Sequence, residues 1–430
     1  MNRSILRLAI PNIISNLSVP LLGMVDMFIA GHLTDENYIG AIAIASIIFN
    51  FIYWGFSFLR MGTSGFAAQA YGKQNRNEQT EVLIRSLYLA LLAGIIIIAL
   101  QGMIALVSFY LLNVDENIKI RTKQYFDIYI WSAPAVLILF SLNGWFIGMQ
   151  NSKIPMVITI AINSLNILLS FLFVYQWKLE IRGIAYASLI AQYTGMVTYL
   201  LICKFRYKHW LENISLKKIS SISSFIPFLK VNRDIFIRTL ALLSVSSFFM
   251  YASSKQGNLI LSANALLMQM FVLFSYIMDG FAYAAESLTG KFVGANKFTS
   301  LKQLINKLLI WSFTIAIIFT LLYTFSLTHL LSFFTDKASL LEICYQYRWC
   351  VICIPLAGFL AFVWDGIFVE ATASRQMRNS MLISVSIFFV CYYGLDKYQN
   401  NHTLWFSFLL YLLSRGLIQS YIAKRFLFVL

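Results

Sequence analysis

Long apolar runs recur along the whole chain and are separated by short polar segments. An α-helix rises 1.5 Å per residue, so a run of about 20 residues can cross the roughly 30 Å hydrocarbon core of a bilayer. The pattern predicts twelve transmembrane helices, over residues 8–31, 40–67, 83–112, 125–149, 154–176, 184–203, 235–254, 258–285, 304–333, 347–369, 379–395 and 403–423.

The composition agrees with a chain that lies mostly in lipid. Of 430 residues, 59% are hydrophobic and 12% charged, whereas soluble domains carry about 25% charged residues. Only helices and closed barrels satisfy their backbone groups in lipid, and the alternating ten-residue segments of a barrel are absent from the sequence. We therefore predict an all-α integral membrane protein. The first run carries Pro11, Pro20 and Asp26 and lacks a signal-peptide pattern, so we expect it to remain as the first helix.

The distribution of basic residues predicts the orientation. If the N-terminus is cytoplasmic, 22 of the 33 Lys and Arg residues, Arg238 among them, fall in cytoplasmic segments and only eight in outside segments. Cytoplasmic loops of membrane proteins carry this excess. We expect a multi-pass protein of the plasma membrane, in bacteria the inner membrane, with both termini cytoplasmic. The net charge of +15 is then a topology signal that anionic membrane lipids also feel, and without a compact basic domain we expect no nucleic-acid partner.

One long polar connection divides the chain. Residues 204–233 are basic and rich in serine, and they are predicted to be cytoplasmic. They separate an N-terminal six-helix bundle, 1–203, from a C-terminal six-helix bundle, 234–430. Each bundle is expected to form one domain.

The two halves also resemble each other at a constant offset of 222 residues. The offset pairs Ala41 with Ala263, Gly72 with Gly294, and Gly144 with Gly366. A repeat with an even number of helices returns the chain to its starting side, so the halves have parallel topology. Such repeats are related by a pseudo-two-fold axis along the membrane normal and suit alternating access.

Motifs of enzymes and metal sites are absent from the sequence. The five cysteines have no repeated pair spacing, and no HExxH, GxSxG or P-loop motif occurs, so nothing predicts a zinc site or a hydrolase. We expect a protein that is not an enzyme, holds no cofactor or metal apart from a coupling ion, and acts as a monomer.

Several segments resemble the multidrug and toxic compound extrusion (MATE) family, and particularly its DinF-like branch. They include "IPNIISNLSVPLLGMVDMFIAGHL", "FLRMGTSGFAAQAYGKQN", "MDGFAYAAESLTGKFVGA" and "DGIFVEATASRQMRNSM", and the likeness covers nearly the whole chain in order. The resemblance implies a twelve-helix antiporter that exports organic, often cationic, amphiphiles in exchange for protons or sodium. It also implies a V-shaped cavity between helices 1–6 and 7–12.

The resemblance implies a proton or ion site in the first half. Asp26 matches a first-helix aspartate linked to proton coupling, and Asn166 matches an asparagine that partners it. Asn163 lies three residues before Asn166 on the same helix face. Ser170 stands where many relatives carry a second aspartate, which puts a two-carboxylate mechanism in doubt. The asparagines are equally well interpreted as hydrogen-bonding residues between helices.

A second group of polar residues is a candidate for the substrate cavity or a polar site of the C-terminal half. Asp279 and Glu286 are seven residues apart and share one face of the eighth helix, and Asp365 lies toward the cytoplasmic end of the tenth. A structural role is left open for Glu286. The full set comprises Asp365, Asp279, Glu286, Asn143, Gln69 and Arg60.

Two absences in the sequence bear on the coupling ion and the class of transporter: an acid in the seventh helix, and several basic residues at membrane depth. Run 235–254 has no acid, whereas sodium-coupled relatives carry one in the seventh helix, so the proton is favoured over sodium. A lipid or lipid-linked oligosaccharide flippase is the alternative. It should line its cavity with several basic residues, yet only Arg60 and Arg348 are predicted at membrane depth. The exporter of small amphiphilic molecules is therefore favoured, and no TVGYG-like filter predicts a channel.

Overall fold

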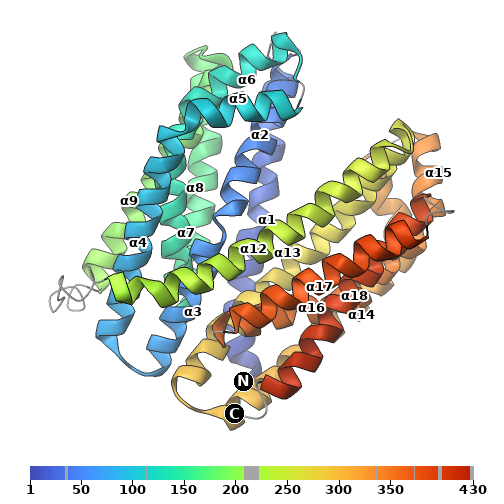
Figure 1. The fold of residues 1–430 in the computed structure, drawn as a ribbon. Coiled ribbons are helices and arrows are strands. Elements are labelled where there is room, and N and C mark those ends of the chain that lie inside the picture. The colour runs from blue at the N-terminus through green and yellow to red at the C-terminus, as the bar shows by residue number, and fades with distance from the viewer. Residues whose placement is uncertain are drawn as a thin grey trace. The chain divides into compact units, whose positions relative to one another are not determined.

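The computed structural model describes residues 1–33, 37–112, 114–207, 222–335, 337–371, 373–395 and 400–426. Within these ranges the secondary structure is helical and contains no strand, as predicted (Figure 1). Residues 208–221, which form much of the expected polar connection 204–233, lie outside the described residues.

The first half contains nine α-helices among its described residues. A 3₁₀ turn, Ile130–Ser132, leads into α7, and a π-helical turn, Leu172–Gln176, extends α8. The helices are α1 (Asn2–Gly31), α2 (Asn37–Gly55), α3 (Phe58–Gly72), α4 (Arg76–Ala99), α5 (Gln101–Leu112), α6 (Glu116–Tyr129), α7 (Ala133–Gly148), α8 (Lys153–Phe171) and α9 (Glu180–Arg206).

The described residues of the second half form seven α-helices. They are α12 (Ile222–Ser254), α13 (Asn258–Gly294), α14 (Phe298–Ser332), α15 (Ala338–Gln346), α16 (Arg348–Glu370), α17 (Ser374–Gly394) and α18 (Asn401–Phe426). The short helix α15 precedes the tenth predicted span. The helix α12 begins at Ile222, within the segment expected to be a connection.

The predicted spans correspond to these helices. Eleven helical segments of the described residues are long and apolar enough to cross a membrane. The remaining predicted span, 379–395, lies almost wholly in α17, whose first residues include Arg375 and Arg378 and are therefore more polar than the rest of the helix. The structure thus has the helices that the twelve-span prediction requires.

The chain forms two compact units. We name residues Ile14–Asn232 the N-lobe, and residues Met1–Ile13 together with Arg233–Leu430 the C-lobe. Helices α1 and α12 therefore each begin in one unit and end in the other. In the C-lobe, the start of α1 packs on α13, where a Cβ added to Gly280 would lie 3.0 Å from the carbonyl oxygen of Ala9.

Close helix packing occurs at equivalent positions in the two lobes. In the N-lobe, Gly144 of α7 brings its helix against the backbone of Arg60 in α3. In the C-lobe, Gly366 of α16 brings its helix against the backbone of Ala282 in α13. Both residues of the second pair follow those of the first by 222 positions, so the repeat seen in the sequence is also a repeat of helix contacts.

Each lobe has its own apolar core in which polar side chains are embedded. An aromatic cluster in the N-lobe centres on the buried Phe49, which stacks on Phe126 with 5.3 Å between ring centroids. In the C-lobe, the buried amides of Asn264 and Asn401 form a reciprocal pair with N–O distances of 2.6 and 3.0 Å. The indole of Trp405 also donates to Asn264, so this buried pair connects α13 with α18.

Candidate functional site

Asp26 lies on α1 in the N-lobe and is half-buried. Its Oδ1 atom is buried without a hydrogen-bond partner. The phenols of Tyr125 and Tyr129 on α6 lie close enough to interact electrostatically with this carboxyl group. An acid within a transmembrane helix is costly and generally serves a function.

A set of hydrogen bonds on α8 and α9 lies next to Tyr125. The amide of Asn166 donates to Ser188 Oγ at 2.9 Å, and Ser170 Oγ donates to Asn166 Oδ1 at 3.1 Å. Tyr125 also interacts with the Ser188 hydroxyl. Asn166 is therefore linked to Asp26 through Ser188 and Tyr125, and the hydroxyl of Ser170 donates to the Asn166 side-chain oxygen.

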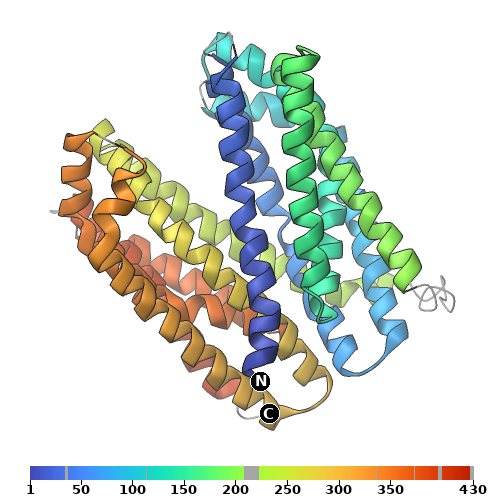
Figure 2. The same cartoon turned by 180° about the vertical axis from the view of Figure 1, so that it is seen from behind.

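Asn163 connects α8 with α1. Its amide donates to the hydroxyl of Ser18 at 3.0 Å and to the Ser18 carbonyl at 3.3 Å. Ser18 lies about two turns before Asp26 on α1. Asn163 thus positions the helix that carries the acid; Figure 2 shows the two helices side by side.

The other candidates of the N-lobe lie on α3 and α7. Arg60 and Gln69 are half-buried residues of α3. Asn143 on α7 accepts a hydrogen bond from the phenol of Tyr199 on α9. This contact joins the fourth and sixth predicted spans.

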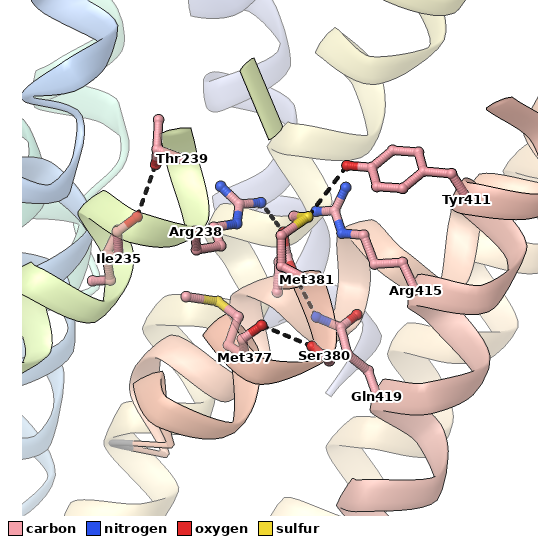
Figure 3. A network of polar contacts seen from close by, with 10 residues as sticks. Ile235, Arg238, Thr239, Met377, Ser380, Met381, Tyr411, Arg415 and Gln419 are labelled. Atoms are coloured by element: carbon pink, nitrogen blue, oxygen red, sulfur yellow. Dashed lines mark hydrogen bonds and ion pairs between the residues drawn. The ribbon is translucent and has the colours of Figure 1, made fainter. Parts of the chain in front are cut away.

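A charged cluster occupies the interior of the C-lobe (Figure 3). The guanidinium groups of Arg238 on α12 and Arg415 on α18 both donate to Oδ2 of Asp365 on α16. The amide of Gln419 donates to the other carboxylate oxygen at 2.6 Å. Only 12% of the Arg238 side chain, 7% of Asp365 and 4% of Arg415 are exposed. We name Arg238, Asp365, Arg415 and Gln419 the arginine cluster.

Arg238 lies within α12, and its side chain is paired with Asp365 inside the C-lobe. The sequence prediction counted it among the cytoplasmic basic residues and gave it no ion-pair partner. A second ion pair lies one turn earlier, where Arg378 Nη1 contacts Asp234 Oδ1 at 2.6 Å. The i, i+4 spacing of Asp234 and Arg238 at the start of an apolar run was the signal for a polar helix face.

The remaining C-lobe candidates are acids of α13. Asp279 is half-buried and interacts electrostatically with Tyr276. Glu286 is 2% exposed. Across the described part of the chain, no three His, Cys, Asp or Glu side chains are grouped so that they could hold a metal ion.

Comparison with known proteins identifies relatives over nearly the whole chain. The MatE family model matches residues 11–172 and 235–393. The DNA damage-inducible protein F of Escherichia coli is 31% identical over 426 residues, which cover 99% of this chain and 92% of the relative. Human multidrug and toxin extrusion protein 1 is 26% identical over 339 residues, which cover 76% of this chain and 56% of that protein.

Solved structures show the same fold. A multidrug resistance MATE family transporter of the MOP superfamily in an outward-facing conformation matches with a TM-score of 0.89 and 16% identity, covering 99% of this chain and 96% of that one. A MATE protein in the straight conformation matches with a TM-score of 0.87, 17% identity and the same coverage. With the family model spanning most of both halves, the chain belongs to the MATE family of multi-pass membrane transporters.

Proposed function

We propose that this transporter exports organic amphiphiles in exchange for protons and that Asp26 carries the proton. The observation that supports the proposal is the buried Asp26 Oδ1 atom without a hydrogen-bond partner. Desolvation favours the neutral form of a carboxyl group, and a nearby donor favours the charged form. A small change in the distance to Tyr125 or Tyr129 would therefore change the proton occupancy of Asp26.

The placement of Asp26 connects protonation with helix movement. Asp26 lies in the part of α1 that belongs to the N-lobe, whereas the first 13 residues belong to the C-lobe. Pro20 lies in the N-lobe part of α1, six residues before Asp26, and removes one backbone donor, which weakens the helix locally. A change in the charge of Asp26 can thus alter the bend of a helix that both lobes share.

The C-lobe residues favour the proton over sodium as the coupling ion. Asp234 of α12 is already paired with Arg378, and Asp365 of α16 with Arg238 and Arg415. Sodium prefers carboxylate and carbonyl oxygens that are free of competing cations. We further propose that the protein works as a monomer in the bacterial inner membrane with both termini cytoplasmic, and that no cofactor is needed besides the ion.

Transport by purified protein in proteoliposomes tests the proposal. Under an imposed pH gradient, a panel of cationic dyes should move in the parent protein, and a sodium gradient alone should not drive them. Asp26→Asn, which is isosteric with the protonated acid, should insert normally but lose proton-driven transport, whereas Asp26→Glu should retain part of it. The control is Asp127→Asn, since Asp127 is an exposed acid paired with Lys123 on α6.

The results decide whether Asp26 carries the proton or has only a structural role. Transport by Asp26→Asn at the parental rate would remove Asp26 from the mechanism. Transport driven equally well by sodium would replace the proton as the coupling ion.

A lipid or lipid-linked oligosaccharide flippase is the second candidate. It gains support from Arg238 and Arg415, two buried arginines that add to the basic residues expected at membrane depth. Reconstituted protein would then move a fluorescent phospholipid between leaflets faster than empty liposomes do, without any ion gradient. If the lipid moves only at the rate of empty liposomes, the exporter remains.

A further inference from the structure

The arginine cluster carries more positive than negative charge. Two guanidinium groups, those of Arg238 and Arg415, meet the single carboxylate of Asp365. The neighbouring acid, Asp234, is engaged by Arg378 and by the exposed Arg233. Charges buried inside a protein are expensive and are normally balanced by an opposite charge. The cluster is therefore one negative charge short of balance.

Donor atoms of the cluster also lack acceptors. Both arginines contact Asp365 through Nη2 and share one carboxylate oxygen. The Nε atoms of Arg238 and Arg415 are buried without a hydrogen-bond partner. Leaving a buried donor unsatisfied is costly, and guanidinium groups match carboxylate, phosphate and sulfonate oxygens particularly well.

We propose that the arginine cluster binds an anionic group of a transported amphiphile. The ligand class is a carboxylate, phosphate or sulfonate attached to an apolar body. The inference rests on the proposed function, because it assigns a substrate class to the proposed exporter. It differs from the often cationic substrates that the family resemblance implies, since the charged residues of this lobe would select a negative group.

The side chains packed around the cluster are buried and largely apolar. The Tyr411 phenol lies 3.2 Å from the sulfur of Met381, and both flank the arginines in Figure 3. Met377 lies on the same helix one turn earlier. Methionine adapts to differently shaped apolar partners. Of the two arginines, Arg238 has the more exposed side chain, so it should contact the anion first.

Two dyes that differ by one ester methyl group test the charge selectivity. Rhodamine 123 is a cationic methyl ester, and rhodamine 110 is the corresponding free acid with an additional carboxylate. Their dissociation constants are measured by fluorescence polarisation on the purified full-length protein in phosphatidylcholine nanodiscs, with empty nanodiscs as background. The parent should bind rhodamine 110 more tightly than rhodamine 123.

Arg238→Gln is the informative variant, because it leaves one arginine and one carboxylate in balance. It should weaken rhodamine 110 binding by about tenfold to a hundredfold, the range that corresponds to a charge-assisted hydrogen bond, and should change rhodamine 123 binding by less than about threefold. Arg238→Lys should retain an intermediate preference because the charge remains. Arg425→Gln is the control, because it removes an exposed arginine of α18 that lies over the Tyr421 ring and does not belong to the cluster.

The outcomes decide between a ligand site and a structural ion cluster. Equal weakening of both dyes by Arg238→Gln, or the same selectivity in this variant as in the parent, would overturn the anion site. Loss of selectivity in Arg425→Gln would do the same. Rhodamine 123 transport by the parent without any preference for rhodamine 110 would overturn the inference and leave the proposed export intact.

A final arm identifies the source of the anionic group. Nanodiscs that contain phosphatidylglycerol are compared with those of phosphatidylcholine alone. Competition by phosphatidylglycerol in the parent but not in Arg238→Gln would identify a lipid headgroup as a ligand of the cluster. Absence of competition, together with selective rhodamine 110 binding, would identify a free anionic amphiphile.

Discussion

Replacing Gly144 or Gly366 with alanine should push apart the two helices that meet at that glycine. A Cβ added to Gly366 would lie 3.1 Å from the carbonyl carbon of Ala282, and closer still to its oxygen. A Cβ on Gly144 would lie 3.0 Å from the carbonyl carbon of Arg60. Backbone atoms cannot rotate away as side chains do, so each added methyl group must push one helix off its partner.

The expected magnitude is the overpacking cost less the gain in helix propensity. Overpacking costs about 1–3 kcal/mol, and alanine stabilises a helix by up to about 1 kcal/mol relative to glycine. We therefore expect Gly144→Ala and Gly366→Ala each to lower the free energy of unfolding by about 1–2 kcal/mol. Gly23→Ala is the control, because a Cβ there meets no atom within 4 Å, and it should be neutral or slightly stabilising.

These differences are measured by unfolding each purified protein in the same detergent and monitoring its helix content by circular dichroism. The gap between each clashing variant and Gly23→Ala isolates the cost of the contact. Unfolding midpoints of Gly144→Ala and Gly366→Ala that coincide with that of Gly23→Ala would refute the close approach. Gly366→Ala should additionally shift the neighbouring Asp365, so its rhodamine selectivity should fall while that of Gly144→Ala stays.

Two further predictions concern orientation and the buried amide pair. The basic residues predict a cytoplasmic N-terminus. On a background without the native cysteines, Asn77→Cys should therefore react with a membrane-impermeant reagent only from the cytoplasm, and Asn117→Cys only from outside. Reversed labelling would contradict this topology. Asn401→Ala should destabilise the protein by about 1–3 kcal/mol, because it removes the two buried hydrogen bonds that the amides of Asn401 and Asn264 exchange. An unchanged unfolding midpoint would show that the pair contributes nothing.

The helical spans and the repeat could be predicted from the sequence because both depend on local patterns. Hydropathy over about 20 residues identifies a span regardless of its neighbours. Breaks within a continuous apolar run carry no such signal. The run 83–112 was predicted as one span, yet the structure divides it near Leu100 into α4 and α5.

The arginine cluster could be predicted only in part because it depends on long-range contacts. Asp365 stood out as an acid within an apolar run. Its partners, Arg238 and Arg415, are 127 and 50 residues away in the sequence, and nothing local predicts which carboxylate they meet. A basic residue near the edge of a span is ordinarily expected to face the aqueous phase, which is why Arg238 was placed in the cytoplasmic segments.

The packing of the two lobes is repeated more faithfully than their chemistry. Asn143 and Asp365 occupy equivalent positions, each directly before the glycine at a close helix contact. Each also accepts a hydrogen bond from the last helix of its own half, from Tyr199 in α9 or from Gln419 in α18. The position thus keeps the same neighbouring helix and differs in charge.

This difference suggests that the lobes divide the work of transport. The offset of 222 pairs Asp26 with Phe248, so the acid that could carry a proton has no counterpart in the C-lobe. Conversely, the equivalents of Arg238 and Arg415 in the N-lobe are the uncharged Asn16 and Tyr193. A proton carrier must be able to change its charge, whereas a site that selects a charged ligand must keep its own charge constant. Separating these requirements on two copies of one scaffold lets each site meet its own.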